Sequence, residues 1–415
     1  MATEPATPSA APISAKAYLS VIGGTSALFC SVGFFIAFGV FQEYYKEHLL
    51  LGTSDFDISW IGSASVFLLY MSAPVCGVLV DKIGPKILLV GGSIGVLISI
   101  FMMSLCSKYY EFFLAQAVLL GISMGFITWP PMAVVSRHLP QHRGLALGIV
   151  TGGSSVGGII WPIMIEQLLT KRKIGFPWTM RVVGFTMMPL LAIACISVME
   201  PSKSDRPLPA SNYIVERDSQ IKPSLFRSSI FISLCIAFGL GFLGLFIPYF
   251  YISSFAAGHG ASTNLSFYMI SIVNAASLFG RVIPGYLADR FGHYNLMILL
   301  LFASGVIAFC WAAVSNLAGI VVWSAAYGFF SGAILSLQGA CVGKIATPQN
   351  QGKAIGFLQG TLAVTVLVGS PIGSQLLAKY GYLALSMFTG STLVMGSIVM
   401  IYARLRLDSN VLASV

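Results

Sequence analysis

The sequence predicts an all-α membrane protein whose twelve transmembrane helices form two pseudo-symmetric six-helix bundles. Of its 415 residues, 56% are hydrophobic and only 9% are charged, whereas a soluble domain carries about 25% charged residues. Its apolar stretches are long enough to cross a bilayer, which takes about 20 residues per helix. The chain also nearly repeats itself at an offset of 208 residues, about half its length. Such duplication of hydrophobic helices is typical of secondary transporters.

The repeat is visible in two separate segments that share this offset. Matching positions are Gly77, Asp81, Gly144 and Gly148 in the first half and Gly285, Asp289, Gly352 and Gly356 in the second. Chance matches among 43 glycines would scatter over many offsets. Small residues at four-residue spacing let helix backbones approach closely in a membrane. We therefore expect the two glycine series to pack between the halves.

Hydropathy places six helices in each half of the chain. In the first half they cover residues 17–44, 58–80, 86–107, 112–136, 144–169 and 178–199. In the second half they cover residues 225–255, 267–287, 296–314, 318–343, 352–378 and 383–405. The predicted units are a disordered cytoplasmic tail (1–16), a first bundle (17–199), a cytoplasmic linker (200–224), a second bundle (225–405) and a second cytoplasmic tail (406–415). The linker holds four prolines and most of the contiguous polar sequence, which is typical of a connection between domains.

The positive charges predict the orientation in the membrane. With both termini cytoplasmic, fifteen Lys and Arg residues fall in cytoplasmic loops and six in external loops, which is the bias that membrane proteins show. The external cluster Lys171–Lys173 opposes this orientation. We expect an integral multi-pass protein of the plasma membrane. Because the net charge of +9 comes from these loops, it does not indicate a nucleic-acid partner.

The sequence offers little chemistry for catalysis. All seven cysteines lie in apolar spans and none forms a CxxC pair, so we expect packing residues rather than disulfides or metal ligands. The segment Gly153-Ser-Ser155-Val-Gly157 fits a hydrolase motif, but that motif needs a strand–turn–helix context with Asp and His partners. We therefore expect no enzyme activity, no cofactor and no metal. A nucleotide-binding loop is not found either, so a gradient would supply the energy.

Two loops carry the same charged turn. The first reads Gly77-Val-Leu-Val-Asp81-Lys-Ile-Gly84, and the second reads Gly285-Tyr-Leu-Ala-Asp289-Arg-Phe-Gly292. Glycine permits a tight turn, and a carboxylate at the membrane edge can pair with a cation or a helix N-terminus. This duplicated loop resembles the G-x-L-x-D-[RK]-x-G loop of the major facilitator superfamily.

The resemblance implies the major facilitator fold and a gate on its cytoplasmic side. The candidate gating residues are Gly77, Asp81, Gly84, Arg143, Gly285, Asp289 and Gly292. Asp81 would hold the two halves together in one state and release them in the other. A static turn without a gating role is the alternative.

Further stretches resemble the monocarboxylate-porter branch of the superfamily, particularly its fungal members. They include Arg143-Gly-Leu-Ala-Leu-Gly148, Trp161-Pro162 and Asn274-Ala-Ala-Ser277-Leu-Phe-Gly280-Arg281. This resemblance covers nearly the whole chain except the tails and the linker. Fungal members include carboxylate porters, a riboflavin carrier and exporters in natural-product clusters. The resemblance therefore narrows the family without fixing the substrate.

Arg281 is the strongest candidate for binding a substrate. It is the one Lys or Arg deep within an apolar span, where an ionisable residue is a functional hypothesis by default. Asn274, Ser277 and Arg281 follow i, i+3, i+7 spacing and so share one helix face. A guanidinium in a cavity between the halves can bind a carboxylate through two hydrogen bonds. The alternative is an arginine that extends to the cytoplasmic surface or pairs with a loop acid.

Proton coupling is less well supported by the same comparison. Well-studied animal members have an aspartate one turn before this arginine, and it is thought to carry the proton. Ser277 occupies that position here, and the lysine of their first helix has no counterpart between Gly33 and Val40. Glu166 is the only acid within the fifth helix and could substitute, although its place near the outer end favours a solvated role.

Helices 1, 4, 7 and 10 line the central cavity in this superfamily. Their polar and aromatic residues add Gln116, Trp129, Tyr249, Tyr327 and Gln338 to the candidate binding residues. Aromatic rings with a few hydrogen-bonding groups fit an amphipathic organic anion. Taken singly, each residue could instead pack in the helix bundle or at the membrane interface.

We therefore predict a secondary active transporter of a small organic anion, a monocarboxylate, that works by alternating access in the lipid bilayer. Coupling to protons stays open. An efflux pump for a fungal secondary metabolite is the first alternative, which the uncharged first-half cavity and the missing acid favour. A nutrient sensor that signals without transport is the second alternative. Such sensors carry long cytoplasmic extensions, whereas the tails and linker here are short.

Overall fold

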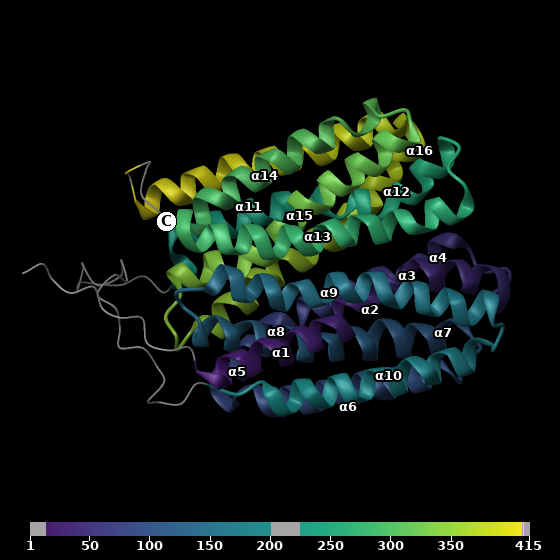
Figure 1. Ribbon diagram of the computed structural model, residues 1–415, viewed down its shortest axis with the longest axis horizontal. Helices are drawn as coiled ribbons and strands as arrows, with labels where there is room; N and C mark the ends of the chain where they lie inside the picture. Colours follow the sequence, from purple (N-terminus) through teal and green to yellow (C-terminus); the bar gives the residue numbers. More distant parts are fainter. Residues whose placement is uncertain (1–13, 201–224, 409, 411–415) are drawn as a thin grey trace, which may run out of the picture.

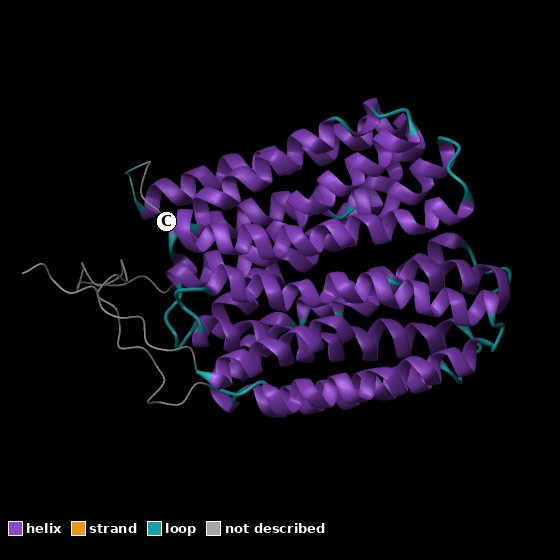
Figure 2. Ribbon diagram, in the orientation of Figure 1, coloured by secondary structure: helices purple, strands orange, loops and turns teal. Residues whose placement is uncertain are grey.

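The computed structural model describes residues 14–200, 225–408 and 410. The predicted linker beyond Glu200 and most of both predicted tails lie outside these residues. Regular structure in the described residues is helical (Figure 2). Because a bilayer offers the backbone no hydrogen-bonding partners, helices that satisfy their own N–H and C=O groups are expected there.

The first half of the chain folds into six spans. Their elements are α1 (Ala15–Cys30), α2 (Val32–Ile36), α3 (Phe38–Tyr44) and η1 (Tyr45–Leu49); α4 (Asp55–Met71) and α5 (Ala73–Ile83); α6 (Pro85–Met103); α7 (Tyr109–Phe112), η2 (Phe113–Leu119) and α8 (Leu120–His138); α9 (Arg143–Glu166) and η3 (Gln167–Lys171); and α10 (Phe176–Ser197). The segments η1, η2 and η3 are π-helical.

The second half repeats this plan. Its elements are the 3-10 turn η5 (Leu225–Arg227), α11 (Ser229–Leu245) and α12 (Ile247–Gly258); α13 (Thr263–Phe291); α14 (His293–Phe309) and the 3-10 turn η6 (Trp311–Ala313); α15 (Leu317–Ile345); and α16 (Gln351–Leu407).

The described residues contain eleven continuous helical segments long and apolar enough to cross a membrane. One of them, α16, has 57 residues and is two helices joined at Gly381, whose φ of 74° is not helical. Glycine adopts this left-handed conformation without steric cost. Counting α16 as two spans gives twelve, which confirms the predicted fold. Every predicted helix end lies within five residues of the observed one.

Several spans are broken near their middle for identifiable reasons. Proline lacks a backbone N–H and disturbs the preceding turn of a helix. Pro74 accordingly follows the junction between α4 and α5, and Pro248 follows the junction between α11 and α12. Span 1 is interrupted at Ser31 and Ala37, where short segments replace a continuous helix. These breaks place irregular backbone near the centre of the molecule.

The two halves lie side by side along their lengths (Figure 1). The start of α1, the end of α10, the start of α11 and the end of α16 lie at one end of the molecule, which we call the terminal end (Figure 1). Two pairs of helices make the largest contacts between the halves. We call the packing of α5 against α16 the first crossing, and that of α9 against α13 the second crossing. The ribbons of the two halves spread apart toward the opposite end (Figure 1).

Candidate functional site

Asp81 joins the two halves at the first crossing. Its carboxylate accepts hydrogen bonds from the backbone N–H groups of Gly352 (3.2 Å) and Lys353 (2.9 Å), at the start of α16. The first N–H groups of a helix have no partner within the helix, and the helix dipole there favours an anion. Arg137, at the end of α8, forms an ion pair with the same carboxylate and a second one with Glu200.

Asp289 makes the equivalent contact at the second crossing. It accepts hydrogen bonds from the N–H groups of Gly144 (2.7 Å) and Leu145 (2.9 Å), at the start of α9. Its side-chain neighbour is His293, whose Nε2 lies 3.0 Å away. Each of these two carboxylates therefore belongs to one half and binds a helix N-terminus of the other.

The predicted gating glycines lie around these carboxylates. A Cβ added to Gly77 would lie 2.1 Å from the Gly352 carbonyl oxygen, and one added to Gly285 would lie 2.5 Å from that of Gly144. Both crossings therefore need glycine for steric reasons. Gly84 and Gly292 end α5 and α13 with positive φ angles of 83° and 96°, so they form the tight turns that the sequence predicts.

Arg143 lies at the same end, at the start of α9. Its Nε donates to the backbone carbonyl of Ser136 (3.3 Å), and its guanidinium lies against Gly343 of α15. The arginine that pairs with Asp81 is instead Arg137, which sequence reasoning had treated only as a loop charge. Its position in the last turn of α8, before a loop, was the available signal.

Arg281 lies at the centre of the seam between the halves and is only 3% exposed. Its Nε donates to the Ser277 hydroxyl (3.2 Å), one turn earlier on α13. Its Nη1 crosses to the first half, where it donates to the carbonyl oxygen of Thr151 and to the hydroxyl of Ser154 on α9. None of the ion pairs among the described residues involves Arg281. The charge is thus solvated only by neutral oxygen atoms.

The structure brings Asn274 and Ser277 into the same neighbourhood. Both are fully buried. The amide oxygen of Asn274 has no hydrogen-bonding partner, and a Cβ added to Gly158 of α9 would lie 3.0 Å from it. The amide nitrogen donates to its own helix, to the carbonyl of Ile270 (2.9 Å). Asn274 therefore presents an unused acceptor to the seam, about two turns from Arg281.

Two tyrosines complete the surroundings of the guanidinium. Tyr70 of α4 and Tyr249 of α12 both interact electrostatically with Arg281, so their hydroxyl groups lie near it. Tyr249 also lies within hydrogen-bonding distance of the Ser331 hydroxyl (3.0 Å). Tyr70 packs on the Phe242 ring of the opposite half. Sequence reasoning missed Tyr70, because it lies on helix 2, outside the helices expected to line the cavity.

Trp129 and Tyr327 support this cluster rather than face an open space. Trp129 packs against Tyr70 with ring centroids 5.5 Å apart, and its indole N–H donates to the Leu69 carbonyl (2.9 Å). Tyr327 is fully buried, and its hydroxyl donates to the Leu245 carbonyl (2.8 Å), at the break between α11 and α12. Both polar groups are already occupied by backbone oxygens of broken spans.

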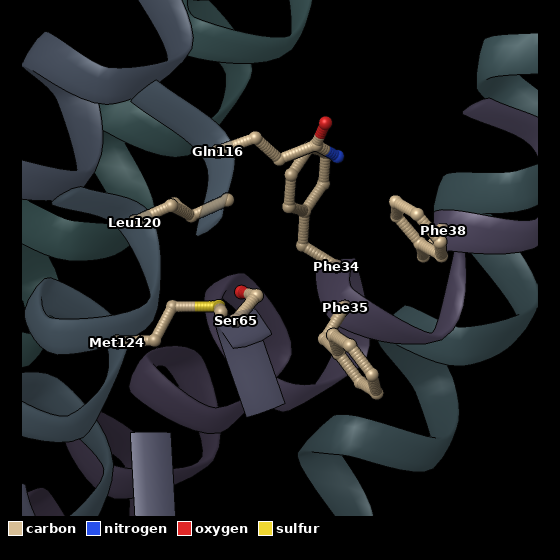
Figure 3. A pocket seen from close by; sticks show the side chains of 7 residues that line it. All are labelled: Phe34, Phe35, Phe38, Ser65, Gln116, Leu120 and Met124. Atoms are coloured by element: carbon tan, nitrogen blue, oxygen red, sulfur yellow. The ribbon is translucent and has the colours of Figure 1, made fainter. Parts of the chain in front are cut away.

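Gln116 lines a separate pocket in the first half (Figure 3). The pocket is formed by Phe34, Phe35, Phe38, Ser65, Gln116, Leu120 and Met124. Gln116 lies on the π-helical segment η2 and accepts a hydrogen bond from the Tyr45 hydroxyl (2.7 Å). Ser65 is buried and its hydroxyl has no partner. Local π-helix often marks a functional site, and this pocket offers apolar surface with two polar groups.

Gln338 is the last of the predicted binding residues. It is on α15, next to Gly339, which faces Leu147 of α9. Its amide nitrogen bonds to its own helix, and its amide oxygen is buried without a partner. In the described part of the chain, no group of three or more His, Cys, Asp or Glu side chains is placed to hold a metal ion. The candidate site is therefore a polar and aromatic cluster around one arginine.

Two six-helix halves that meet around a buried charge are an arrangement typical of secondary transporters. The family model that matches this chain is the Major Facilitator Superfamily, over residues 24–325 and 271–412. The chain belongs to this superfamily, as the duplicated loop indicated.

Curated relatives cover almost the whole chain. An MFS-type transporter of Aspergillus fumigatus is 72% identical over 97% of this chain and 95% of its own length. The agnestins efflux protein of Paecilomyces divaricatus is 42% identical over 96% of this chain and 89% of its own. The aspyridones efflux protein of Emericella nidulans is 36% identical over 94% of this chain and 78% of its own.

Among solved structures, the human organic anion transporter TETRAN resembles this chain with a TM-score of 0.70. The two chains are 14% identical, and the match covers 92% of this chain and 98% of the human protein. At this level of identity the likeness shows the fold alone.

Proposed function

We propose that this protein is an efflux transporter that exports an acidic secondary metabolite. The observation that carries the proposal is Arg281, a buried guanidinium at the seam whose partners are all neutral oxygen atoms. A buried charge is costly in a membrane unless it is compensated, and a carboxylate or phenolate is its natural partner. The transported anion would supply the missing negative charge.

Export of a metabolite has more support than uptake of a small monocarboxylate. Two relatives that match most of the chain are named as efflux proteins for fungal metabolites. The surroundings of Arg281 also include Tyr70 and Tyr249, and the Phe242 ring that packs on Tyr70. Aromatic surface of this extent suits a molecule larger than lactate or pyruvate.

In this proposal the terminal end faces the cytoplasm and is closed in the conformation described. The distribution of Lys and Arg supports the orientation. Asp81 and Asp289 would hold this end closed by binding the N-termini of α16 and α9. The substrate would enter when these contacts break and leave toward the opposite end when they form.

The test is a gene deletion in the organism that carries this protein. Acidic metabolites would be measured by mass spectrometry in cells and in the medium, before and after wild-type protein is restored. We expect at least one acidic metabolite to accumulate in deletion cells and to reach the medium again on restoration. A deletion strain with an unchanged distribution of acidic metabolites contradicts the proposal.

Arg281→Ala provides the site-specific arm of this test. Loss of a buried partner of an ion pair costs about 2–5 kcal/mol, so we expect export to fall by roughly 100-fold. Arg290→Ala is the matched control, because Arg290 lies on the same helix but is exposed and stacks on Tyr286. Uptake of labelled lactate and pyruvate in the same strains tests the monocarboxylate alternative, which is favoured if only these acids depend on the protein.

A further inference from the structure

The guanidinium of Arg281 is shared between the two halves. Nε bonds within the second half, to Ser277, whereas Nη1 bonds across the seam to Thr151 and Ser154 of α9. Among the described residues no hydrogen bond uses Nη2. Ser154 in turn donates its hydroxyl proton to the Thr151 carbonyl (2.9 Å). The two acceptors on α9 therefore form one connected oxygen pair.

These contacts depend on how closely α9 and α13 approach. Gly148, one turn before Thr151, packs so tightly on α13 that an added Cβ would lie 2.3 Å from the Arg281 carbonyl oxygen. Asp289 fixes the same two helices further along, through the N–H groups of Gly144 and Leu145. The oxygen pair can reach Nη1 only while this crossing is closed.

A carboxylate needs two neighbouring N–H groups on one edge of a guanidinium to bind it in the bidentate manner. One edge of Arg281 uses Nη1 and Nη2, and the other uses Nε and Nη2. The first edge is blocked by Thr151 and Ser154, and the second by Ser277. Bidentate binding of an anion therefore requires that one of these existing partners gives way.

We propose that Ser154, together with the Thr151 carbonyl, is an internal competitor of the transported anion. When the terminal end closes, these oxygens take Nη1–H groups of Arg281 and lower its affinity for the anion, which then leaves at the opposite end. Closure and anion binding are thermodynamically coupled, so each must weaken the other. A bound anion therefore destabilises the closed form of the second crossing. The inference rests on the proposed role of Arg281 and adds the residue that promotes release.

Ser154→Ala isolates this contact. It removes one of the two acceptors and leaves the backbone carbonyl in place. Ser155→Ala is the matched control, because Ser155 is equally buried on the same helix but its hydroxyl has no partner. A hydrogen bond to a charged group is worth about 1.5–3 kcal/mol, so loss of one of the two acceptors should shift the closure equilibrium by about 10-fold.

The readout is the distance between spin labels at exposed positions 82 and 344, one in each half at the terminal end. The full-length protein would carry Lys82→Cys and Lys344→Cys, with its seven native cysteines replaced, in lipid nanodiscs. Without any anion, we expect Ser154→Ala to raise the population with a long distance about 10-fold over the parent protein. Ser155→Ala should stay within about 2-fold. Equal populations in the two variants overturn the inference.

The second arm adds 2-naphthoate, an aromatic carboxylate, to the same samples. We expect it to increase the long-distance population in the parent protein and to have no effect in Arg281→Ala. The proposed competition between Ser154 and the anion is overturned if the long-distance population does not increase in the parent protein. It is also overturned if the increase persists in Arg281→Ala. If Arg281→Ala loses metabolite export while Ser154→Ala behaves as Ser155→Ala, the export proposal stands and the competitor role alone fails.

Discussion

The two crossings between the halves share one backbone arrangement and differ in side-chain chemistry. At the first, Asp81 binds the N–H groups of Gly352 and Lys353; at the second, Asp289 binds those of Gly144 and Leu145. Each participant lies 208 positions from its counterpart. The duplication has therefore preserved both the helix contact and its carboxylate cap.

The difference lies one or two turns inward along the same helices. Ala73 of the first crossing corresponds to Arg281 of the second, and Gln359 corresponds to Thr151 at the offset of 208 residues. Gly356 packs on the backbone of Ala73, as Gly148 packs on that of Arg281. The first crossing thus closes on a small apolar residue and an uncharged amide, whereas the second closes on a cation. This asymmetry separates a packing contact from a candidate binding site.

The first test disrupts the close glycine contact that the two crossings share. Gly77→Val and Gly285→Val each place side-chain atoms where a carbonyl oxygen already lies. Overpacking of a rigid contact costs about 1–3 kcal/mol or more, so we expect transport to fall roughly 100-fold in both. Gly91→Val is the control, because nothing lies within 4 Å of an added Cβ there. Normal transport in Gly77→Val at normal membrane abundance argues against closure at this crossing.

Substitution of the two carboxylates, Asp81 and Asp289, should lower transport by different amounts. Asp81 carries a buried ion pair with Arg137 besides its helix contact, whereas Asp289 has the His293 ring within hydrogen-bonding distance and interacts electrostatically with Lys344. Removing one partner of a buried ion pair costs about 3–5 kcal/mol, and a carboxylate at a helix N-terminus contributes about 0.3–2 kcal/mol. We expect Asp81→Asn to lower transport about 30-fold and Asp289→Asn about 3-fold. Equal losses would show that Arg137 contributes nothing to the first crossing.

A double variant sharpens this prediction. Asp81→Asn with Arg137→Gln removes both charges of the pair and leaves no buried cation uncompensated. We expect the double variant to recover at least about 5-fold of the activity that Asp81→Asn loses. Transport rates of the four proteins in this cycle give the coupling between the two residues. Strictly additive losses would contradict a direct interaction.

Substitution of Gln359 tests the part of the first crossing that lies one or two turns from Asp81 toward the middle of the helices. It is fully buried, and neither its amide nitrogen nor its amide oxygen has a partner. An unsatisfied buried polar group costs about 1–3 kcal/mol, so Gln359→Leu should raise the melting temperature of the purified protein by a few degrees. Gln351→Leu is the control and should lower it, because that side chain bonds to the Ser136 hydroxyl. A lower melting temperature for Gln359→Leu would indicate that its amide is satisfied.

The smallest effect is expected for Thr151, the residue of the second crossing that corresponds to Gln359. Thr151 offers Arg281 its backbone carbonyl, while its own hydroxyl bonds to the Leu147 carbonyl (2.8 Å) within α9. Thr151→Val keeps the carbonyl and loses only a hydroxyl bond to the previous turn of the same helix, which adds little stability, so we expect transport within about 2-fold of wild type. A larger loss would mean that the hydroxyl, rather than the backbone, serves the site.

Much of the fold followed from local sequence signals. Hydropathy located the helices, because each span must cover its own backbone in lipid. Gly381 divides the last pair of spans, and it lies in the gap between residues 378 and 383 that hydropathy left between the predicted helices. The turns at Gly84 and Gly292 were equally clear, since only glycine readily takes their positive φ angles.

The candidate site was predicted in outline and differed in its details. Arg281, Asn274 and Ser277 do lie together on one helix, as their spacing required. The sequence could not indicate that Tyr327 and Trp129 already use their polar groups on the backbone at Leu245 and Leu69. Those contacts depend on which neighbouring helix packs against the carbonyl oxygens that the proline-broken spans leave without a partner.

The sequence by itself determined the membrane class, the duplicated plan and the presence of a cation within an apolar span, because these follow from composition, periodicity and the cost of charge in lipid. Only the tertiary structure decided the partners of that cation. Arg281 meets Thr151 and Ser154, 130 and 127 residues away in the chain. Helix spacing fixes which residues share a face, but the registry of α9 against α13 depends on the glycine contacts between them. That registry selects which oxygens reach the guanidinium.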